Sequence, residues 1–227
     1  GATGSFGIAA FAEALADGDT MARAAVVLVL LAFFLKAAVV PFHAWAPDAY
    51  EAASVPVTAY MATVIKSAVL FAAVRMFAGA EVPSSYVVVL AGLPLVSMVW
   101  GNLTAMRQDG FRRMIAYSSI AQAGYILIGF ICLRTDVSSN FLGINGTFFY
   151  LFGYLFTNLA VFLAVIAFEH ATGSTEIADY RGLVKRSPVL AGVLLIGFLS
   201  LAAIPGTAGF LGKFLVFGSA IQLGLWQ

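Results

Sequence analysis

Long apolar runs separated by short polar connections make up most of this chain. A run of about 20 apolar residues is long enough to cross the hydrocarbon core of a membrane as a helix. We therefore expect six spanning helices, at roughly residues 22–45, 56–78, 86–105, 114–133, 144–168 and 188–221. The pattern predicts an all-α integral membrane fold, in which residues 1–227 form a single membrane domain.

The first and the last of these helices contain residues that break a helix. With its flank included, the first contains Pro41 and Pro47, and the last contains "IPGTAG" at 204–209, with Pro205 and Gly206. A broken helix frees backbone carbonyls, which in a membrane need a partner from protein or from water. Two interrupted helices in one chain indicate a transport site. Two kinked packing helices are an equally good interpretation, because proline is common in membrane helices.

Composition supports a membrane protein and excludes several other classes. The chain is 62% hydrophobic and 10% charged, and its mean hydropathy is +0.97, whereas soluble domains are roughly a quarter charged. No basic cluster suits a nucleic-acid partner. Cys132 is the single cysteine, so an internal disulfide and a cysteine metal site are both excluded. We expect no metal or cofactor to bind this chain.

The basic residues predict an orientation in the membrane. Six of them lie in the connections after the third and fifth helices, and three lie on the opposite side. The richer side is expected to be cytoplasmic, which suits a multi-pass protein of a bacterial plasma membrane. The two sets are Arg107, Arg112, Arg113, Arg181, Lys185 and Arg186, against Arg23, Arg75 and Arg134.

Three lysines, Lys36, Lys66 and Lys213, fall within apolar segments. A cation at the bilayer centre costs about 2.5–3.5 kcal/mol even on lenient scales, so such a residue suggests function. The alternative is that each lysine lies near a helix end and extends its ammonium to the membrane surface. Lys66 fits this alternative least well, because the predicted helix continues in both directions from it. Burial away from water disfavours the charged form of a lysine, and a nearby carboxylate favours it. A change in these surroundings can therefore load or release a proton, which makes the three lysines candidate proton-transfer groups.

The acidic residues do not accompany these lysines. All eleven Asp and Glu residues lie in connections or near helix ends. We therefore expect the counter-ion of a buried lysine to come from sequence outside these 227 residues. Both ends of the chain lie in or near apolar sequence, and we expect them to continue into a longer membrane protein.

Polar residues near the lysines are candidate relay groups. His43 follows Lys36 by seven residues, on a similar helix face, and histidine titrates near neutral pH; a structural residue beside the break is an equal alternative. "YSSIAQAGY" at 117–125 places Gln122 and Tyr125 close to one helix face, together with Tyr117 and Ser118. Polar contacts that hold packed helices together explain this face at least as well.

Four segments of the chain share a recognisable pattern: "FLKAAVVPFHAWAPDAYEAASVPVTAYMATVIKSAVLFAAVRMF" (34–77), "RRMIAYSSIAQAGYILIG" (112–129), "DYRGLVKRSPVL" (179–190) and "LSLAAIPGTAGFLGKFLVF" (199–217). Taken together, they resemble the antiporter-like membrane subunits of respiratory complex I. The part "PVTAYMATVIK" (56–66) points to the subunit N branch of that family, while "PFHAWAPDA" (41–49) also suits the multisubunit cation/proton antiporters.

This resemblance implies a fragment of a larger antiporter-like fold that translocates protons. It implies that Lys36 and Lys213 are the lysines of two broken helices, that Lys66 is the central lysine, and that His43 is the histidine after the first break. The glutamate expected to pair with Lys36 belongs to an upstream helix. Gln122 departs from the family, since many relatives carry histidine there, so a titrating role at this position is in doubt.

In such a complex, NADH, FMN, iron–sulfur clusters and quinone belong to other subunits, and the neighbours of this chain are further antiporter-like membrane subunits. The alternative functions are a subunit of a cation/proton antiporter and a purely structural membrane scaffold. The scaffold hypothesis predicts that replacing Lys66 leaves proton pumping intact. The antiporter hypothesis predicts sodium–proton exchange without association with a quinone-reducing complex.

Overall fold

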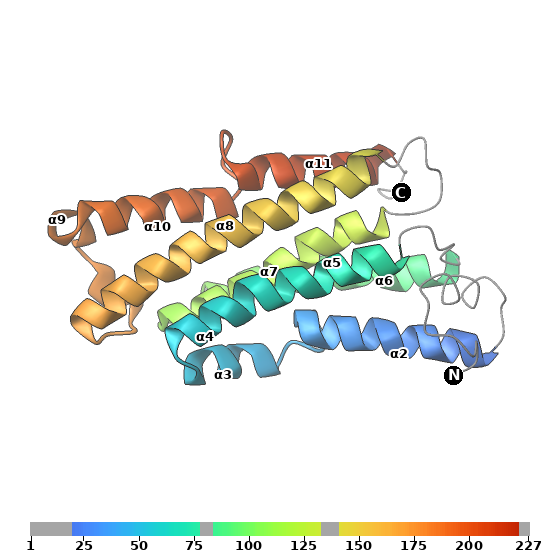
Figure 1. Cartoon of the computed structure of the whole chain (residues 1–227), viewed down its shortest axis with the longest axis horizontal. Coiled ribbons are helices and arrows are strands. Elements are labelled where there is room, and N and C mark those ends of the chain that lie inside the picture. Colours follow the sequence, from blue (N-terminus) through green and yellow to red (C-terminus); the bar gives the residue numbers. More distant parts are fainter. Residues whose placement is uncertain (1–19, 78–83, 133–140, 223–227) are drawn as a thin grey trace.

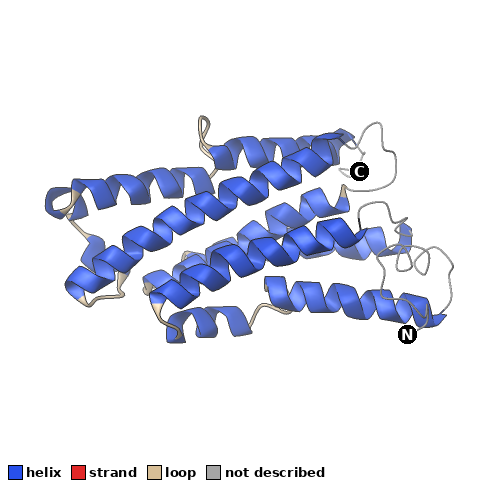
Figure 2. Cartoon of the chain, viewed as in Figure 1, coloured by secondary structure: helices blue, strands red, loops and turns tan. Residues whose placement is uncertain are grey.

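The computed structural model describes residues 20–77, 84–132 and 141–222. These residues are almost entirely helical, which confirms the all-α prediction (Figures 1 and 2). One isolated antiparallel bridge, between Gly110 and Glu176, is the β pairing in this part of the chain. The helices lie side by side, mostly along the long axis of the molecule (Figure 1).

The first predicted helix is interrupted as expected, but earlier than Pro41. α2 (Thr20–Ala37) ends, and α3 (Trp45–Ala52) begins after an irregular segment that contains the cis peptide Val40–Pro41. Pro47 does not break a helix, because it lies in the first turn of α3, where no intrahelical donor is needed. The predicted helix 22–45 thus ends at Ala37, and a second helix begins at Trp45.

The second helical run contains a rare element. α4 (Val55–Tyr60), a π-helical turn (Met61–Ile65) and α5 (Lys66–Phe77) follow one another without a gap. α6 (Ser84–Ala105) and α7 (Phe111–Ile131) come next and pack closely. A side chain at Gly101 would lie 2.7 Å from the backbone nitrogen of Ala121. Small residues at such positions let membrane helices approach.

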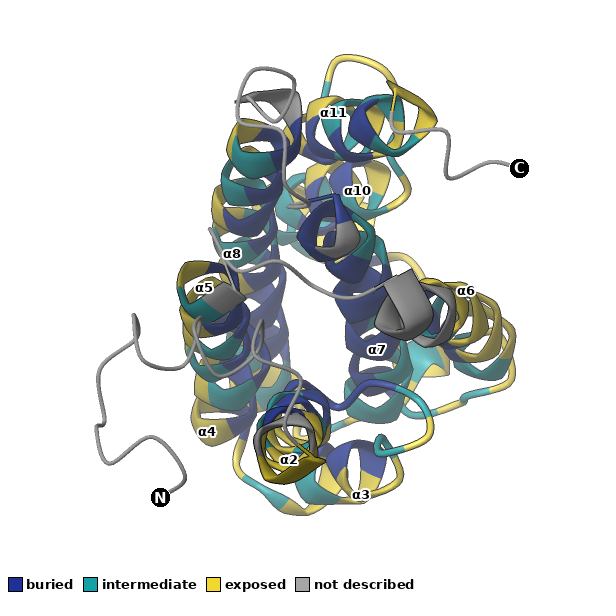
Figure 3. Cartoon of the chain, turned by 90° about the vertical axis from the view of Figure 1, so that its right-hand side faces the viewer, coloured by how far each residue is buried: buried dark blue, intermediate teal, exposed yellow. Residues whose placement is uncertain are grey.

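The C-terminal part repeats the pattern of a broken helix. The long helix α8 (Phe141–Thr172) leads through a 3-10 turn (Ile177–Tyr180) and the short α9 (Leu183–Arg186) into α10 (Pro188–Leu201). After a break that contains Pro205 and Gly206, α11 (Ala208–Gln222) completes the described chain. The pairs α2/α3 and α10/α11 lie on opposite sides of the molecule, with α7 and α8 between them (Figures 1 and 3).

α2 and α10 end in the same backbone motif. In each, an alanine with positive φ follows the helix, Ala38 at 57° and Ala203 at 61°. The next N–H donates to the carbonyl five residues earlier, which is the 6→1 bond of a Schellman motif. These bonds are Val39 to Phe34 at 2.9 Å and Ile204 to Leu199 at 3.0 Å. Glycine normally takes the left-handed position, so alanine there carries some backbone strain.

Ion pairs fix one end of the helix bundle. The guanidinium of Arg112 donates to both carboxylate oxygens of Glu169, at 3.1 and 2.6 Å, and to the carbonyls of Glu51 and Ala53 at the end of α3. Arg113 pairs with Glu51 and with Asp48. Arg112 and Arg113 thus lie in the first turn of α7, rather than in the preceding connection as predicted.

The connection after α8 packs onto this same end. The Tyr180 ring stacks on Phe111 and on Phe168, with ring centroids 4.6 and 3.7 Å apart. Burial raises the pKa of the Tyr180 hydroxyl, so this side chain stays neutral beside Glu169. The stacked rings therefore hold the segment 173–187 against α7 and α8 by packing, and the tyrosine adds no charge there.

The outward faces of the helices are apolar. Leu28, Trp100 and Ile196 are each more than half exposed, at 66%, 51% and 67%. Within the described residues, Val55–Met76 and Gly143–Thr172 are long and apolar enough to cross a membrane, by length and composition alone. Three shorter apolar helices accompany them: Ala24–Ala37, Pro188–Leu201 and Ala208–Gln222. Exposed apolar area of this extent marks surfaces that contact lipid or other protein.

Candidate functional site

Lys66 is fully buried in the middle of the molecule, with 1% of its surface exposed. Its ammonium donates to two oxygens of one residue on α7: the Ser119 hydroxyl at 2.8 Å and the Ser119 carbonyl at 3.0 Å. The Ser119 hydroxyl in turn donates to the carbonyl of Ala116. None of the ion pairs in the described part of the chain includes Lys66.

Ser119 also connects Lys66 to the helix that follows the first break. The side chain of Tyr50, on α3 and 1% exposed, is hydrogen-bonded to Ser119. Thr58 holds the backbone of Tyr50 through a bond of 2.8 Å to its carbonyl. The hydroxyl of Thr63, three residues before Lys66, donates to the carbonyl of Ala59 in the same helical run.

Gln122 lies one turn beyond Ser119 on α7 and is 4% exposed. Its amide nitrogen donates to the carbonyl of Leu201, the last residue of α10, at 3.1 Å. The Tyr150 hydroxyl donates to its amide oxygen. A carbonyl only accepts, so the nitrogen must face Leu201 and the oxygen must face Tyr150. The amide of Gln122 therefore has one fixed orientation.

Lys213, in α11, reaches the same carbonyl from the other side of the second break. Its ammonium donates to the Leu201 carbonyl at 2.9 Å and lies 3.9 Å from the centre of the Tyr125 ring. That aromatic face stabilises a cation. The Tyr125 hydroxyl accepts from Asn102 of α6 at 3.2 Å. Tyr125 thus belongs to the site as a cation-binding ring.

These two sets of contacts meet on α7, where Ser119 and Gln122 lie one helical turn apart. We call the polar groups together the central polar row: Lys66, Ser119, Gln122, the Leu201 carbonyl and Lys213. α7 supplies Ser119, Gln122 and Tyr125 at intervals of three residues, which places them along one helix face. α7 lies among the other helices with its inner face buried (Figure 3). The sequence predicted Lys66, Lys213, Gln122 and Tyr125, and the structure brings these four together.

Lys36 and His43 lie outside this row. Lys36 is exposed in the last turn of α2, because the helix does not resume until Trp45. His43 lies in the break and packs edge-on against Trp100, with ring centroids 6.2 Å apart. Its Nδ1 atom is buried and has no hydrogen-bond partner. The prediction that Lys36 and His43 act in proton transfer stays a prediction.

The two breaks themselves differ in what they offer. Pro41, Pro205 and Gly206 are all exposed. Gly206 has a φ of 94°, which favours glycine. The contribution of the second break to the row is the carbonyl of Leu201, which the end of α10 leaves without an intrahelical donor.

Three residues of the site were missed from the sequence: Ser119, Tyr150 and Tyr154. Ser118 was named instead of Ser119, because adjacent serines lie about 100° apart on a helix and the partner helix was not known. Tyr150 and Tyr154 are both 2% exposed and lie four residues apart on α8. Tyr150 donates to Gln122 and Tyr154 to the Ala62 carbonyl. Their i, i+4 spacing in a mostly apolar helix was a usable signal.

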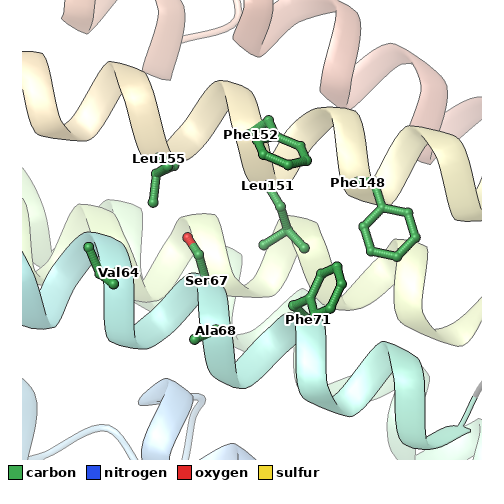
Figure 4. Close-up of a pocket in the computed structure, with 8 residues that line it drawn as sticks. All are labelled: Val64, Ser67, Ala68, Phe71, Phe148, Leu151, Phe152 and Leu155. Atoms are coloured by element: carbon green, nitrogen blue, oxygen red, sulfur yellow. The ribbon is translucent and has the colours of Figure 1, made fainter.

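No group of three or more His, Cys, Asp or Glu that suits a metal ion occurs among the described residues. An open apolar groove lies between α5 and α8, next to the site (Figure 4). Phe71, Phe148 and Phe152 line it, and the Ser67 hydroxyl is its polar side chain. The groove gives an outward-facing apolar surface on the far side of the helix that carries Lys66.

Comparison with known proteins identifies the family of this chain. The family model for NADH:quinone oxidoreductase/Mrp antiporter, TM, matches residues 1–227. NADH-quinone oxidoreductase subunit N of Desulfitobacterium hafniense is 42% identical over 99% of this chain and 48% of its own length. The resemblance to subunit N is thereby confirmed.

Solved structures show the same fold. A chain of the Mrp complex from Dietzia sp. DQ12-45-1b matches with a TM-score of 0.86 and 30% identity, over 99% of this chain and 41% of its own. A chain of respiratory complex I from Thermus thermophilus matches with a TM-score of 0.76 and 30% identity, over 96% and 50%. The present chain thus spans about half the length of these relatives. It belongs to the NADH:quinone oxidoreductase/Mrp antiporter transmembrane family.

Proposed function

We propose that this chain is part of a proton-translocating membrane subunit of an NADH:quinone oxidoreductase, of the subunit N type. The observation that carries the proposal is the central polar row, in which two lysines inside an apolar core are hydrogen-bonded to groups on one face of α7 and at the end of α10. Neither lysine is ion-paired among the described residues. A buried cation without a carboxylate is costly, so its proton is readily exchanged when the surroundings change.

Lys66 and Lys213 hold the protons at the two ends of the row. Gln122 lies between them, one helical turn from Ser119, and donates to the Leu201 carbonyl without taking a charge, since an amide does not titrate. Gln122 and Lys213 donate to the same Leu201 carbonyl. A change in the charge of Lys213 therefore alters the bond that holds Gln122, and it influences Lys66 through α7.

Lys36 is assigned to a third proton-exchange position. We infer that a glutamate of an earlier helix approaches its ammonium to within about 4–6 Å, where an opposite charge acts strongly. The exposure of Lys36 on α2 is compatible with a partner element on that face. His43, beyond the break, is the candidate relay from this position.

The complete enzyme is proposed to hold its redox chemistry elsewhere. NADH, FMN, iron–sulfur clusters and quinone would bind other subunits, and this subunit would lie beside other antiporter-like subunits in a bacterial plasma membrane. The similarity to a bacterial subunit N supports this placement. Energy would reach the row as a shift of charge or conformation in the neighbouring subunit.

The decisive experiment replaces Lys66 by alanine in the intact complex. We expect normal assembly, with proton pumping and coupled quinone reduction both lowered. Lys185→Ala is the matched control, because Lys185 is exposed in α9 and lies outside the row. A correctly assembled Lys66→Ala complex that pumps normally would refute the proposal.

One observation favours a second function, a subunit of a cation/proton antiporter. The TM-score with the Mrp complex, 0.86, exceeds that with complex I, 0.76. This function predicts sodium–proton exchange in membrane vesicles and no association with quinone-reducing subunits. A structural scaffold, in contrast, predicts that Lys66→Met leaves pumping unchanged.

A further inference from the structure

The helix that carries Lys66 contains its π-helical turn immediately before that lysine, at Met61–Ile65. A π turn holds one residue more than an α turn, so one carbonyl of the helix loses its usual intrahelical donor. Inside a membrane such a carbonyl needs a donor from another element. The described structure supplies that donor from α8.

The donor is Tyr154. Its hydroxyl donates to the carbonyl of Ala62, within the π turn, at 2.8 Å. Tyr154 is 2% exposed, so water does not compete for this bond. The side chain of Asn158, one turn further along α8 and 1% exposed, lies beside the same hydroxyl. The hydroxyl is thus held between α8 and the π turn.

The position of the π turn decides where Lys66 points. The extra residue of a π turn can shift along a helix, and each residue that it passes rotates by about 100°. Lys66 is the first residue after the turn, and its ammonium reaches Ser119 at 2.8 Å. A shift of the turn by a few positions would carry this ammonium away from α7.

We propose that Tyr154 is the positioning residue for Lys66: its hydroxyl holds the π turn at Met61–Ile65 and thereby keeps the Lys66 ammonium on Ser119. The proposal rests on the proposed function, in which Lys66 carries protons. Tyr154 itself neither touches Lys66 nor belongs to the central polar row. It acts through the backbone of the helix that it holds.

The first test measures the π turn directly, as amide hydrogen exchange of residues 59–66 in the intact, purified complex. Tyr154→Phe removes one oxygen and keeps the ring in place. Exchange in this segment should become roughly fivefold faster, the effect of losing one hydrogen bond, while exchange in α7 stays unchanged. Tyr60→Phe is the matched control, because Tyr60 lies in the same helical run and is 56% exposed. Unchanged exchange in Tyr154→Phe would overturn the proposal.

The second test separates positioning from general packing by measuring protons pumped per NADH oxidised. Tyr154→Phe should lower this ratio severalfold, and it should cause no further loss when Lys66 is already alanine. A further loss in the Lys66→Ala background would overturn the proposal, because Tyr154 would then act on packing elsewhere. Normal pumping by Lys66→Ala alone would overturn the proposed function and this role with it, whereas the exchange rates would still report whether Tyr154 holds the turn.

Discussion

α2 and α10 end in the same Schellman motif, but different side chains reach their last turns. After α2, the carbonyl of Leu35 accepts from the indole of Trp45 at 2.9 Å. After α10, the carbonyl of Leu201 accepts from Gln122 and from Lys213. The first end is thus capped by an aromatic residue eight positions beyond the helix, and the second by two residues of the candidate site.

The lysines of the two breaks differ accordingly. Lys36 precedes its break and is exposed on α2, whereas Lys213 follows its break and points back to a freed carbonyl. A broken helix supplies unpaired carbonyls in both places. The second break belongs to the candidate site because Gln122 and Lys213 donate to its freed carbonyl. A break in a helix is not sufficient to form such a site.

The largest effect is expected at the second break. Lys213→Ala removes the ammonium and should lower proton pumping by roughly tenfold or more, the loss of a positioned proton-transfer group. Lys213→Arg keeps a cation and its donors but does not release a proton, since arginine stays charged. We expect both variants to assemble and to lose pumping, measured as proton uptake in vesicles.

Lys185→Arg, at an exposed site, provides the control for the change of side chain. Normal pumping by Lys213→Arg would show that Lys213 serves as a fixed charge on the Leu201 carbonyl and exchanges no proton. The second break would then have a structural role only.

At the first break, the expected effect is smaller and depends on a partner. Lys36→Ala should lower coupled activity by roughly fivefold, and removal of the partner glutamate should do comparable harm. The double variant should lose much less than the sum, because the two groups act as one pair. Simple addition of the two effects, or a complete structure with no carboxylate near Lys36, would contradict the pairing.

A third, smaller effect is expected at Gln122, whose amide donates to the Leu201 carbonyl at the second break. Gln122→Glu places a second acceptor opposite the Leu201 carbonyl and a new anion between the lysines, and should lower turnover by roughly threefold. Gln122→His keeps both bonds, because a neutral imidazole donates to Leu201 and accepts from Tyr150. Steady-state quinone reduction in membranes measures both. Equal, wild-type turnover in the two variants would remove Gln122 from the path.

Much of this fold could be predicted from the sequence because lipid imposes a simple length rule. The apolar runs indicated the helices, and the proline and glycine residues indicated both interruptions. The isolated position of Lys66 among apolar residues marked it as a candidate site residue, because a cation there has few structural explanations.

The contacts between helices could not be predicted in the same way. Which serine of α7 meets Lys66 depends on the rotation of two helices about their axes, and an error of one residue changes the face. Lys36 was expected to lie within a spanning segment, and it lies instead in the last turn of α2 with its side chain exposed. The π turn leaves no pattern in the sequence, since it depends on a donor 92 residues away.

The smallest expected effect tests whether the two helix ends are equivalent as backbone structures. Ala38 and Ala203 have φ values of 57° and 61°, a conformation that costs a residue with a Cβ roughly 1–2 kcal/mol. Glycine avoids this cost but loses more freedom on folding, so Ala38→Gly and Ala203→Gly should each stabilise the protein by about 0.5 kcal/mol. Thermal denaturation of the purified complex measures the change, and pumping should stay normal. Ala202→Gly is the matched control, because Ala202 has a φ of −73° and should become less stable. Opposite signs for Ala38→Gly and Ala203→Gly would show that the shared motif carries different strain at the two breaks.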